Sequence, residues 1–323
     1  MSQAKHMSKA TGAYDPKFEY RFLLPRFWLT WIGLGILRFS IYVPRVFFSA
    51  LGFLLGDLFY FANKKRRTIV KTNIKLAFPE WNHSQQDHLV RAHFRVFMQT
   101  VLDIPVLWWA SPQYLDRFIR VQGLENYKKH YDQGRHVILL TGHFVALEFG
   151  GVITSRYFPQ IGLIKPARNH LINWFIHRGR SRFGARLFLR KTGLRSLVRS
   201  IKSGYGFYYL PDEDHGPDKS VFVPFLGTEA ATITGAAKLV QLCDAVALPA
   251  YIKRLASGGY ELIMQPALED FPSGNEYNDA KRISEQLEKH VRDVPAQYMW
   301  TFRRYHSRPD NKPTPYERSK RRQ

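Results

Sequence analysis

HVILLTGHFVALEFGG, residues 136–151, joins an unbroken apolar run to a histidine and, five positions later, a glutamate. The apolar run predicts a strand over residues 137–141 that is covered on both faces, because strands with one wet face alternate in polarity. Gly142 then lets the backbone turn sharply, so that His143 emerges at the carboxyl end of the strand. Open α/β sheets bind their ligands at that edge.

The spacing of His143 and Glu148 suits chemistry only if the histidine precedes the regular helix, since otherwise the two side chains lie on different faces. From that position the carboxylate could accept the proton of one imidazole nitrogen and leave the other nitrogen free as a base. The alternative is a core histidine with no chemical role and a first-turn acid that suits the helix dipole. These sixteen residues alone favour neither interpretation.

Composition indicates a globular chain with an anionic partner. The 323 residues are 45% hydrophobic and 15% aromatic, which suffices for one large α/β domain with a sizeable core. The net charge of +22 fits nucleic acid, acidic lipid headgroups, a phosphorylated substrate or an acidic protein. The single cysteine, Cys243, excludes an intrachain disulfide and a multi-cysteine zinc site, and its apolar setting predicts a packed, unreactive thiol.

Two apolar runs near the N-terminus, residues 28–43 and 46–62, favour attachment to a membrane. Both are slightly short for a spanning helix, and Arg38 and Asp57 interrupt them, so a pair of buried core helices is the alternative. Aromatic residues and arginines crowd the same segment, as they do at membrane interfaces. The cations Lys64-Lys65-Arg66-Arg67 follow directly and suit anionic lipid on the cytoplasmic face.

Downstream, short apolar segments alternate with amphipathic ones, as is typical of an α/β domain. A capping box at Ser84-x-x-Asp87 predicts a long helix that runs towards Trp109. The expected strands are residues 119–121, 137–141, 162–165, 206–210, 245–251 and 260–264. The expected helices are residues 124–131, 145–156, 171–183, 194–203, 235–242 and 279–292.

Two further strand ends carry polar residues. Pro211-Asp212-Glu213-Asp214-His215-Gly216 follows the strand at 206–210, and Asp212 would approach His143 if the two strands lay side by side and parallel. A plain turn explains the same residue types. The second group, which suits a phosphate or a developing oxyanion but equally a solvated helix face, consists of Lys165, Arg168, Asn169, Arg178, Arg180 and Arg182.

A set of short motifs occurs in a fixed order along residues 22–309. The motifs are Phe27-Trp28-Leu29-Thr30-Trp31 with Gly33, Lys64-Lys65-Arg66-Arg67 with Asn73 and Phe78-Pro79-Glu80, His143-x4-Glu148, Asn169 through Gly179-Arg180, Pro211-Asp212 through Gly216, and Gln297-Tyr298-Met299-Trp300 through Arg308-Pro309. Together they resemble the bacterial lipid A lauroyl/myristoyl acyltransferase family, within the His-x4-Asp/Glu lysophospholipid acyltransferase superfamily.

The resemblance implies an α/β fold with a mixed sheet flanked by helices, like that of glycerol-3-phosphate acyltransferases, and no cofactor or metal. It implies a membrane-anchored O-acyltransferase at the cytoplasmic face of the inner membrane. The implied donor is acyl carrier protein, and the implied acceptor is a hydroxyl of a Kdo-linked lipid A precursor.

The resemblance also assigns roles to residues. His143 matches the family's base and Glu148 its carboxylate partner, so both are expected to be catalytic. The residues expected at the substrate are Lys165, Asn169, Arg180, which would bind a phosphate or an oxyanion, and Asp212, which would position the site. Lys165 stands where the family usually has arginine, and Glu213-Asp214-His215 replaces its common His-Asp-Tyr run.

The chain is therefore expected to comprise a polar tail (1–21), a membrane-anchor segment (22–63), an acyltransferase domain (64–309) and a basic tail (310–323). One alternative is a related membrane acyltransferase for another glycolipid or a lysophospholipid. Another is a non-catalytic basic protein that binds membranes or nucleic acid. Only charge supports the last, and no recognised nucleic-acid motif accompanies it, so we expect no nucleic-acid partner.

Overall fold

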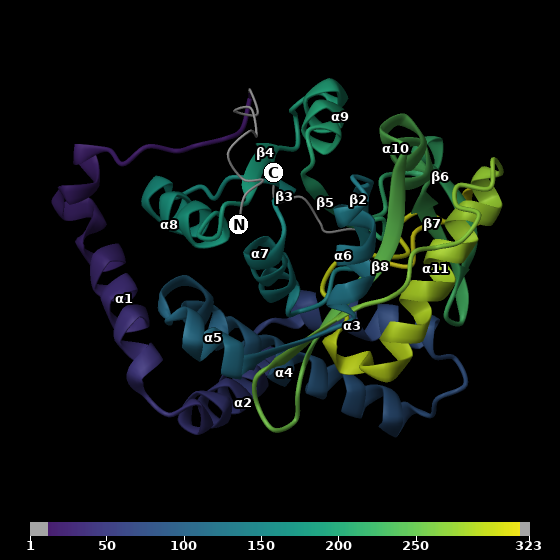
Figure 1. The fold of residues 1–323 in the computed structure, drawn as a ribbon. Coiled ribbons are helices and arrows are strands. Elements are labelled where there is room, and N and C mark those ends of the chain that lie inside the picture. The colour runs from purple at the N-terminus through teal and green to yellow at the C-terminus, as the bar shows by residue number, and fades with distance from the viewer. Residues whose placement is uncertain (1–11, 317–323) are drawn as a thin grey trace.

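A seven-stranded mixed sheet forms the centre of the computed structural model, which describes residues 12–316 (Figure 1); residues 1–11 and 317–323 of the expected tails lie outside that range. The strands are β1 (Ile119–Gln122), β2 (His136–Leu140), β3 (Gln160–Ile164), β4 (Arg186–Leu189), β5 (Gly206–Tyr209), β8 (Ala245–Arg254) and β9 (Tyr260–Met264). Their order is β1-β9-β8-β2-β5-β3-β4. Strands β8 and β9 pair antiparallel and all other neighbours pair parallel. The predicted α/β fold with a mixed sheet is confirmed.

Helices cover both faces of this sheet (Figure 1). The α-helices of the described residues are α1 (Trp28–Phe39), α2 (Arg45–Ala62), α3 (Lys64–Ala77), α4 (His83–Trp109), α5 (Pro112–Phe118), α6 (Leu124–Asp132), α7 (Leu147–Tyr157), α8 (His170–Arg180), α9 (Leu194–Lys202), α10 (Gly235–Cys243) and α11 (Glu276–Asp293), of which α1, α2, α3 and α8 do not belong to the core clusters on the sheet. A second, two-stranded antiparallel sheet of β6 (Ser220–Phe225) and β7 (Thr228–Ile233) packs against α11.

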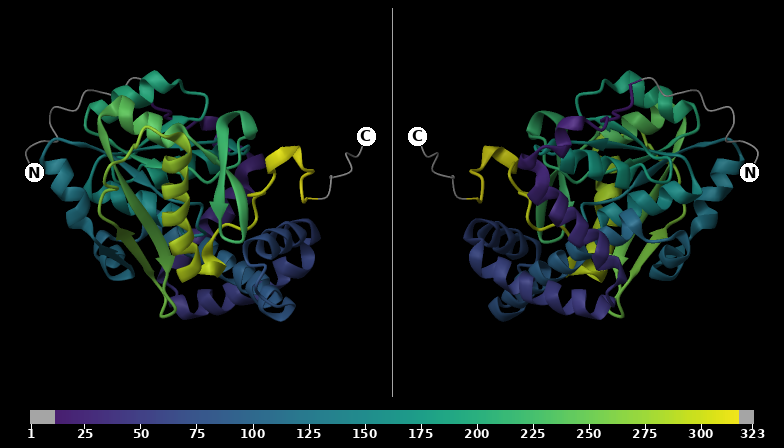
Figure 2. Two further views of the ribbon diagram at one scale, coloured as in Figure 1. Left: turned by 90° about the vertical axis from the view of Figure 1, so that its right-hand side faces the viewer. Right: turned by 90° about the vertical axis from the view of Figure 1, so that its left-hand side faces the viewer.

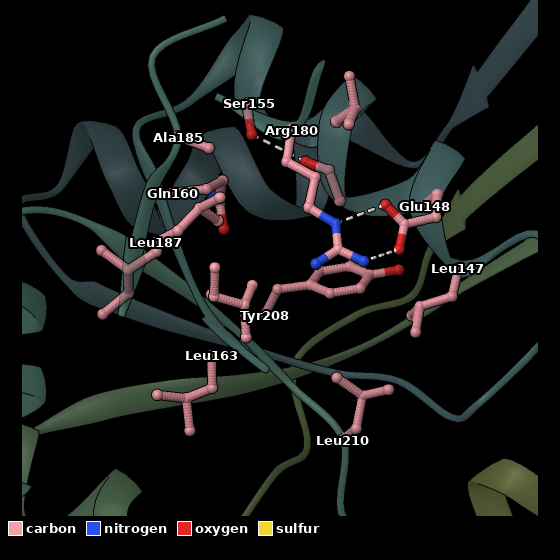
Figure 3. A pocket seen from close by; sticks show the side chains of 15 residues that line it. Leu147, Glu148, Ser155, Gln160, Leu163, Arg180, Ala185, Leu187, Tyr208 and Leu210 are labelled. Atoms are coloured by element: carbon pink, nitrogen blue, oxygen red, sulfur yellow. Dashed lines mark hydrogen bonds and ion pairs between the residues drawn. The ribbon is translucent and has the colours of Figure 1, made fainter. Parts of the chain in front are cut away.

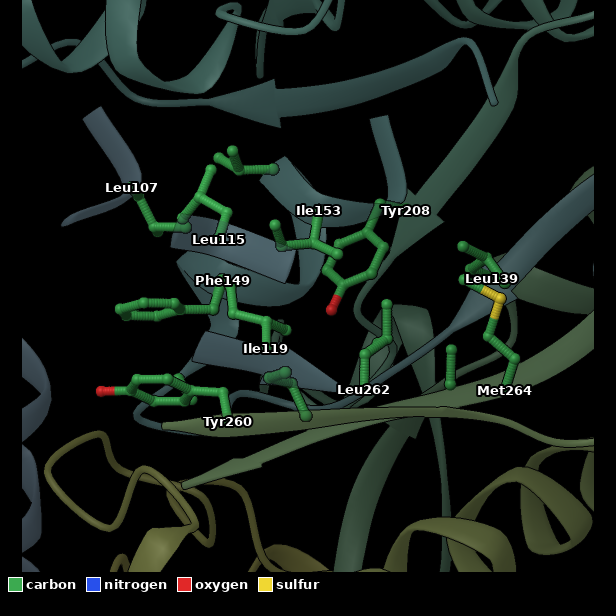
Figure 4. Packing of buried hydrophobic residues seen from close by; sticks show 14 of the residues in the cluster. Leu107, Leu115, Ile119, Leu139, Phe149, Ile153, Tyr208, Tyr260, Leu262 and Met264 are labelled. Atoms are coloured by element: carbon green, nitrogen blue, oxygen red, sulfur yellow. The ribbon is translucent and has the colours of Figure 1, made fainter. Parts of the chain in front are cut away.

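Strand β2 is covered on both faces, as its unbroken apolar sequence predicts. Val137 and Leu139 belong to the core cluster around α7, whereas Ile138 and Leu140 belong to the cluster under α9 and α10. Figure 4 shows Leu139 in the first cluster among side chains from α5, α7 and β9. The strand is therefore held at the centre of the molecule, and its carboxyl end has a fixed place.

Among the strands and α-helices of the described residues, the sequence patterns do not predict β4, β6, β7 and α5. β4 has four residues and α5 seven, which is too few for a periodic pattern to stand out. The start of α4 also differs from the prediction. The capping box joins Asn82 and Gln85, whose side chains each accept the other's backbone N–H at 2.9 Å, and Ser84 and Asp87 lie within the helix.

The two N-terminal apolar runs form α1 and α2 on the outside of the molecule, at the left and lower edge of Figure 1. Among residues 12–316, α2 alone has the length and apolar composition of a helix that could cross a bilayer. Both helices leave large apolar side chains exposed, including Leu29 of α1 at 83% and Phe47 of α2 at 65%. The membrane anchor itself stays a prediction, since length and composition do not show a membrane.

The C-terminal segment returns to the body of the protein (Figure 2, yellow). Asn73 of α3 donates a hydrogen bond to the backbone carbonyl of Trp300 at 2.7 Å, and Arg304 donates to the carbonyl of Ala231 in β7 at 2.6 Å. Tyr316 is buried and belongs to the core cluster around α3. Residues after Trp300 therefore bridge α3 and the β6–β7 hairpin.

Two buried histidines are expected to make the stability of the fold sensitive to acid. Burial lowers the pKa of His93 in α4 and of His290 in α11 to about 4, so both stay neutral in the folded protein at pH values where an unfolded chain already binds protons. Stability should therefore be complete above the unfolded pKa of about 6.5 and fall as the pH drops towards 4, by on the order of 3 kcal/mol per histidine. Denaturant titrations at pH 7 and pH 4.5 measure this loss.

The double variant His93→Gln with His290→Gln should lose much less stability between the two pH values than the parent, because glutamine does not titrate. His83, an exposed histidine at the start of α4, provides the control substitution His83→Gln, which should leave the pH dependence unchanged. An equally steep loss in the double variant would show that other groups cause the acid sensitivity.

Candidate active site

Two adjacent parallel strands bring His143 and Asp212 together. Strand β2 pairs with β5, and Leu140 at the end of one strand lies opposite Tyr209 at the end of the other. His143 follows β2 by three residues and Asp212 follows β5 by three residues, so both loops leave the sheet at the same edge. The predicted approach of Asp212 to His143 is confirmed.

Asp212 forms hydrogen bonds through both carboxylate oxygens. Oδ1 lies 2.7 Å from Nδ1 of His143, and Oδ2 accepts the backbone N–H of His143 at 2.8 Å. The hydroxyl of Tyr298 donates to the same Oδ2 at 2.9 Å. An ionised carboxylate only accepts hydrogen bonds, so Nδ1 of His143 carries the proton and Nε2 is the nitrogen that can act as a base.

The two partners differ in how far solvent can reach them. Asp212 is 1% exposed, whereas the side chain of His143 is 22% exposed, so the carboxylate is hidden behind an imidazole that a substrate can reach. Burial lowers the pKa of His143, but the charge and hydrogen bond of Asp212 outweigh burial and raise that pKa above its usual value. Burial raises the pKa of Asp212, but the charge of His143 and its hydrogen bonds outweigh burial and lower that pKa below its usual value. Asp212 therefore stays ionised and makes the imidazole of His143 a stronger base than a free histidine.

The C-terminal return, defined here as residues 297–305, fixes the loop that carries His143. The backbone N–H of Val145 donates to the carbonyl of Gln297 at 2.8 Å, and the N–H of Met299 donates to the carbonyl of His143 at 2.7 Å. Tyr298 lies between these two bonds and is fully buried. Tyr298 belongs to one of the short sequence motifs, but nothing in that motif indicates that its partner is Asp212, 86 positions earlier.

Glu148 does not pair with His143 as the spacing and the resemblance predict. Its carboxylate accepts two hydrogen bonds from Arg180 at the end of α8, one from Nε at 2.8 Å and one from Nη2 (Figure 3). Among residues 12–316 no hydrogen bond joins Glu148 to His143. The reason is geometric, because Asp212 already occupies Nδ1 and Glu148, in the first turn of α7, faces α8.

A cavity of about 130 Å³ begins at the Glu148–Arg180 pair and lies between α7 and the strands β3, β4 and β5. Its walls are mainly aliphatic (Figure 3), and the apolar lining residues are Leu147, Val152, Ile161, Leu163, Ile164, Ala185, Leu187 and Leu210. It extends from the first turn of α7 to Ser155 in its last turn. Gln160, which is 2% exposed and donates to the Tyr127 hydroxyl at 2.9 Å, lies at the far end.

Three other singled-out residues do not line this cavity. Asn169 caps α8, and its side-chain oxygen accepts the N–H groups of Leu171 at 3.0 Å and Ile172 at 3.1 Å. Lys165 follows β3 at the same sheet edge as His143 and is exposed. Cys243 is buried as predicted, and burial raises the pKa of its thiol. In the described part of the chain, no group of three or more His, Cys, Asp or Glu residues suits a metal ion.

Comparison with known proteins identifies relatives along nearly the whole chain. The model of the bacterial lipid A biosynthesis acyltransferase family matches residues 15–307. The chain is 34% identical to the lipid A biosynthesis lauroyltransferase of Escherichia coli K12, an alignment that covers 93% of this chain and 99% of the relative. It is 31% identical to the palmitoleoyltransferase of the same organism, over 91% and 96%, and 27% identical to its myristoyltransferase, over 96% and 97%.

The pairing of His143 can be tested by removing one carboxylate at a time. Asp212→Asn should lower the pKa of His143 below the usual value of about 6.5, because the opposing charge disappears while burial remains. Glu148→Gln should change that pKa little, because Glu148 bonds to Arg180. NMR titration of labelled histidine measures both values. A fall of the pKa in Glu148→Gln as large as in Asp212→Asn would contradict the observed pairing.

Proposed function

The chain belongs to the bacterial lipid A biosynthesis acyltransferases and is an O-acyltransferase; from this premise we propose a donor, an acceptor and a mechanism. The donor is acyl carrier protein with a chain of the lauroyl or myristoyl class. The acceptor is a hydroxyl of a Kdo-linked lipid A precursor. The observation that carries the proposal is the buried, hydrogen-bonded His143–Asp212 pair at the carboxyl edge of the sheet.

His143 acts as the general base. Its Nε2 takes the proton of the acceptor hydroxyl while the oxygen attacks the thioester carbonyl, and Asp212 stabilises the imidazolium that forms. When the tetrahedral intermediate collapses, the C–S bond breaks and the imidazolium returns the proton to the departing sulfur. An ester and a free thiol result, with no covalent acyl-enzyme, and the buried Cys243 is not required.

Glu148 and Arg180 act together in the wall of the cavity. Two hydrogen bonds to Glu148 hold the guanidinium in one orientation, and Arg180 lines the cavity beside it. A cation in this position can stabilise the negative charge that develops on the thioester oxygen, or bind a phosphate of the acceptor. Glu148 then orients Arg180 rather than His143.

The apolar cavity receives the acyl chain. The charged pair Glu148–Arg180 lies in its wall, and most of the remaining lining side chains are aliphatic, which suits a hydrocarbon chain. Asn169 contributes by capping α8, the helix that delivers Arg180. Lys165, exposed at the same sheet edge, is placed to meet a phosphate of the lipid acceptor.

The acceptor is a lipid, so the enzyme works at a membrane. Relatives of this kind imply membrane association, and we assign the chain to the cytoplasmic face of the inner membrane with α1 and α2 as its attachment. The exposed apolar side chains of these helices and the following lysines and arginines support this location.

The proposed reaction is tested with the purified full chain in detergent, acyl carrier protein loaded with a lauroyl or myristoyl group, and the Kdo-linked precursor. Mass spectrometry should find a product heavier by one acyl chain. His143→Ala should reduce the rate by about 10²–10⁴-fold, because a general base is lost. His136→Ala, at the opposite end of the same strand, is the matched control and should retain activity.

The effects of His143→Ala and Asp212→Asn should be far from additive, because the two residues act as one unit. If the His143→Ala variant formed the acylated product at nearly the parent rate, the mechanism would be refuted. Trapping an acyl group on Cys243 would refute direct transfer.

Salt should reveal how the donor is recognised. Acyl carrier protein is strongly acidic, and a chain with a net charge of +22 should attract it electrostatically. Raising the salt concentration should therefore increase the KM for this donor more than it lowers kcat, since screening at a Debye length of about 10 Å acts on the encounter and much less on a buried pair. Acyl-coenzyme A should be the poorer donor. Equal use of both donors, or a KM that does not respond to salt, would contradict electrostatic recognition.

A further inference from the structure

Helix α2 lies against α4 so closely that the two backbones touch. Gly52 and Gly56 are both buried at this contact. A Cβ atom at Gly52 would lie 2.6 Å from Cα of Gln99, and one at Gly56 would lie 2.4 Å from Cα of Arg95. No side chain larger than hydrogen fits at either position. The contact ties α2 to α4 at two positions that lie about one helical turn apart.

The same side of α2 carries polar groups that are paired with α4. From one end of the helix to the other, the pairs are Arg45–Asp103, Ser49–Gln99 and Asp57–Arg95. Both carboxylate oxygens of Asp57 accept hydrogen bonds from Arg95, at 2.7 and 2.8 Å, and Gln99 donates to the hydroxyl of Ser49 at 2.9 Å. Polar contacts therefore run along the whole inner face of the helix.

The opposite face of α2 is apolar and exposed. Its large side chains recur every three or four residues, which places them on one side of a helix, and they are Phe47, Leu51, Leu54, Leu58 and Phe61, with exposed fractions of 42–65%. Helix α1 has an equivalent exposed row with the same spacing, made of Trp28, Ile32, Ile36 and Phe39. An apolar surface of this extent indicates an interaction site.

These contacts argue against a spanning helix. With 18 residues α2 is roughly 27 Å long, so it would cross a hydrocarbon core of about 30 Å only if it stood nearly upright. Its partner α4 would be drawn in beside it, together with Asp57, Arg91, Arg95 and Asp103. Charged side chains are strongly disfavoured there, and α4 continues into the core of the catalytic domain through Leu107.

Charge identifies the kind of surface that covers the apolar face. Lys64, Lys65 and Arg66, directly after α2, are exposed, and so is Arg26 before α1. Cations that flank an apolar face on both sides are suited to anionic headgroups around a patch of acyl chains.

We propose that α1 and α2 form a platform embedded in one leaflet of an anionic bilayer, with α2 parallel to the membrane plane and the chain never crossing it. The proposal rests on the membrane location given under Proposed function and adds its geometry. In this orientation the apolar rows sink about 5–10 Å into the leaflet, and the polar pairs with α4 stay above it. Trp31 of α1 stacks edge-on against Phe175 of α8 with ring centroids 5.6 Å apart, so the platform is also joined to the helix that carries Arg180.

Depth measurements on the full chain distinguish a flat helix from a spanning one. In a Cys243→Ser background, single cysteines introduced by Phe47→Cys, Leu54→Cys and Phe61→Cys carry an environment-sensitive fluorophore. Vesicles of phosphatidylglycerol and phosphatidylethanolamine contain nitroxide lipids labelled at shallow or deep positions. All three sites should show the same shallow depth, and Leu242→Cys, exposed on α10 away from the platform, should show no quenching. A deep Leu54 site between two shallow ones would establish a spanning helix and overturn the proposal.

Vesicle binding provides an independent measurement. The double substitution Leu54→Glu with Leu58→Glu should weaken sedimentation with these vesicles at least tenfold, whereas the matched change Leu242→Glu should not. Acyl transfer in detergent should persist in the double variant, so a failure of the platform is distinguishable from a failure of the proposed reaction. Unchanged vesicle binding would overturn the proposal. A second outcome would also overturn it. If the parent chain were a dimer in lipid-free solution and the double variant a monomer, the apolar face of α2 would join two copies of the chain.

Discussion

The site depends on keeping one carboxylate ionised inside the protein. Asp212 is almost completely buried, and an unpaired charge in that position would be strongly unfavourable. Two N–H groups of His143 and the hydroxyl of Tyr298 supply the hydrogen bonds that stabilise it. The three residues come from the loop after β2, the loop after β5 and the C-terminal return. The sheet, its register and the return of the chain therefore have to be correct together before the imidazole is oriented.

Much of this architecture could be predicted from the sequence because it depends on local patterns. The unbroken apolar run before Gly142 indicates a strand covered on both faces, and the structure has β2 there. Which carboxylate serves His143 is a different matter. Glu148 is close in sequence and Asp212 is distant, but parallel pairing of β2 with β5 brings Asp212 nearer. That choice depends on strand order, which residue spacing does not encode, and Tyr298 escaped prediction for the same reason.

The N-terminal segment shows a second limit of sequence patterns. Hydropathy sums a helix over all its faces, so α2 has the composition of a membrane span. The small residues Gly52 and Gly56 and the polar residues Ser49 and Asp57 all lie on the side that meets α4. When its two sides are considered separately, α2 is amphipathic, and the polar side forms hydrogen bonds and ion pairs with α4.

The C-terminal return has a consequence for the order in which the protein becomes functional during synthesis. The apolar segment of α1 and α2 leaves the ribosome well before residues 297–305. Until Tyr298 emerges, Asp212 lacks one of its donors, and the His143 loop lacks its backbone bonds to Gln297 and Met299. A nascent chain can thus reach a lipid surface while the loop that carries His143 is still unsupported. Emergence of residues 297–305 then supplies these bonds and completes the surroundings of His143.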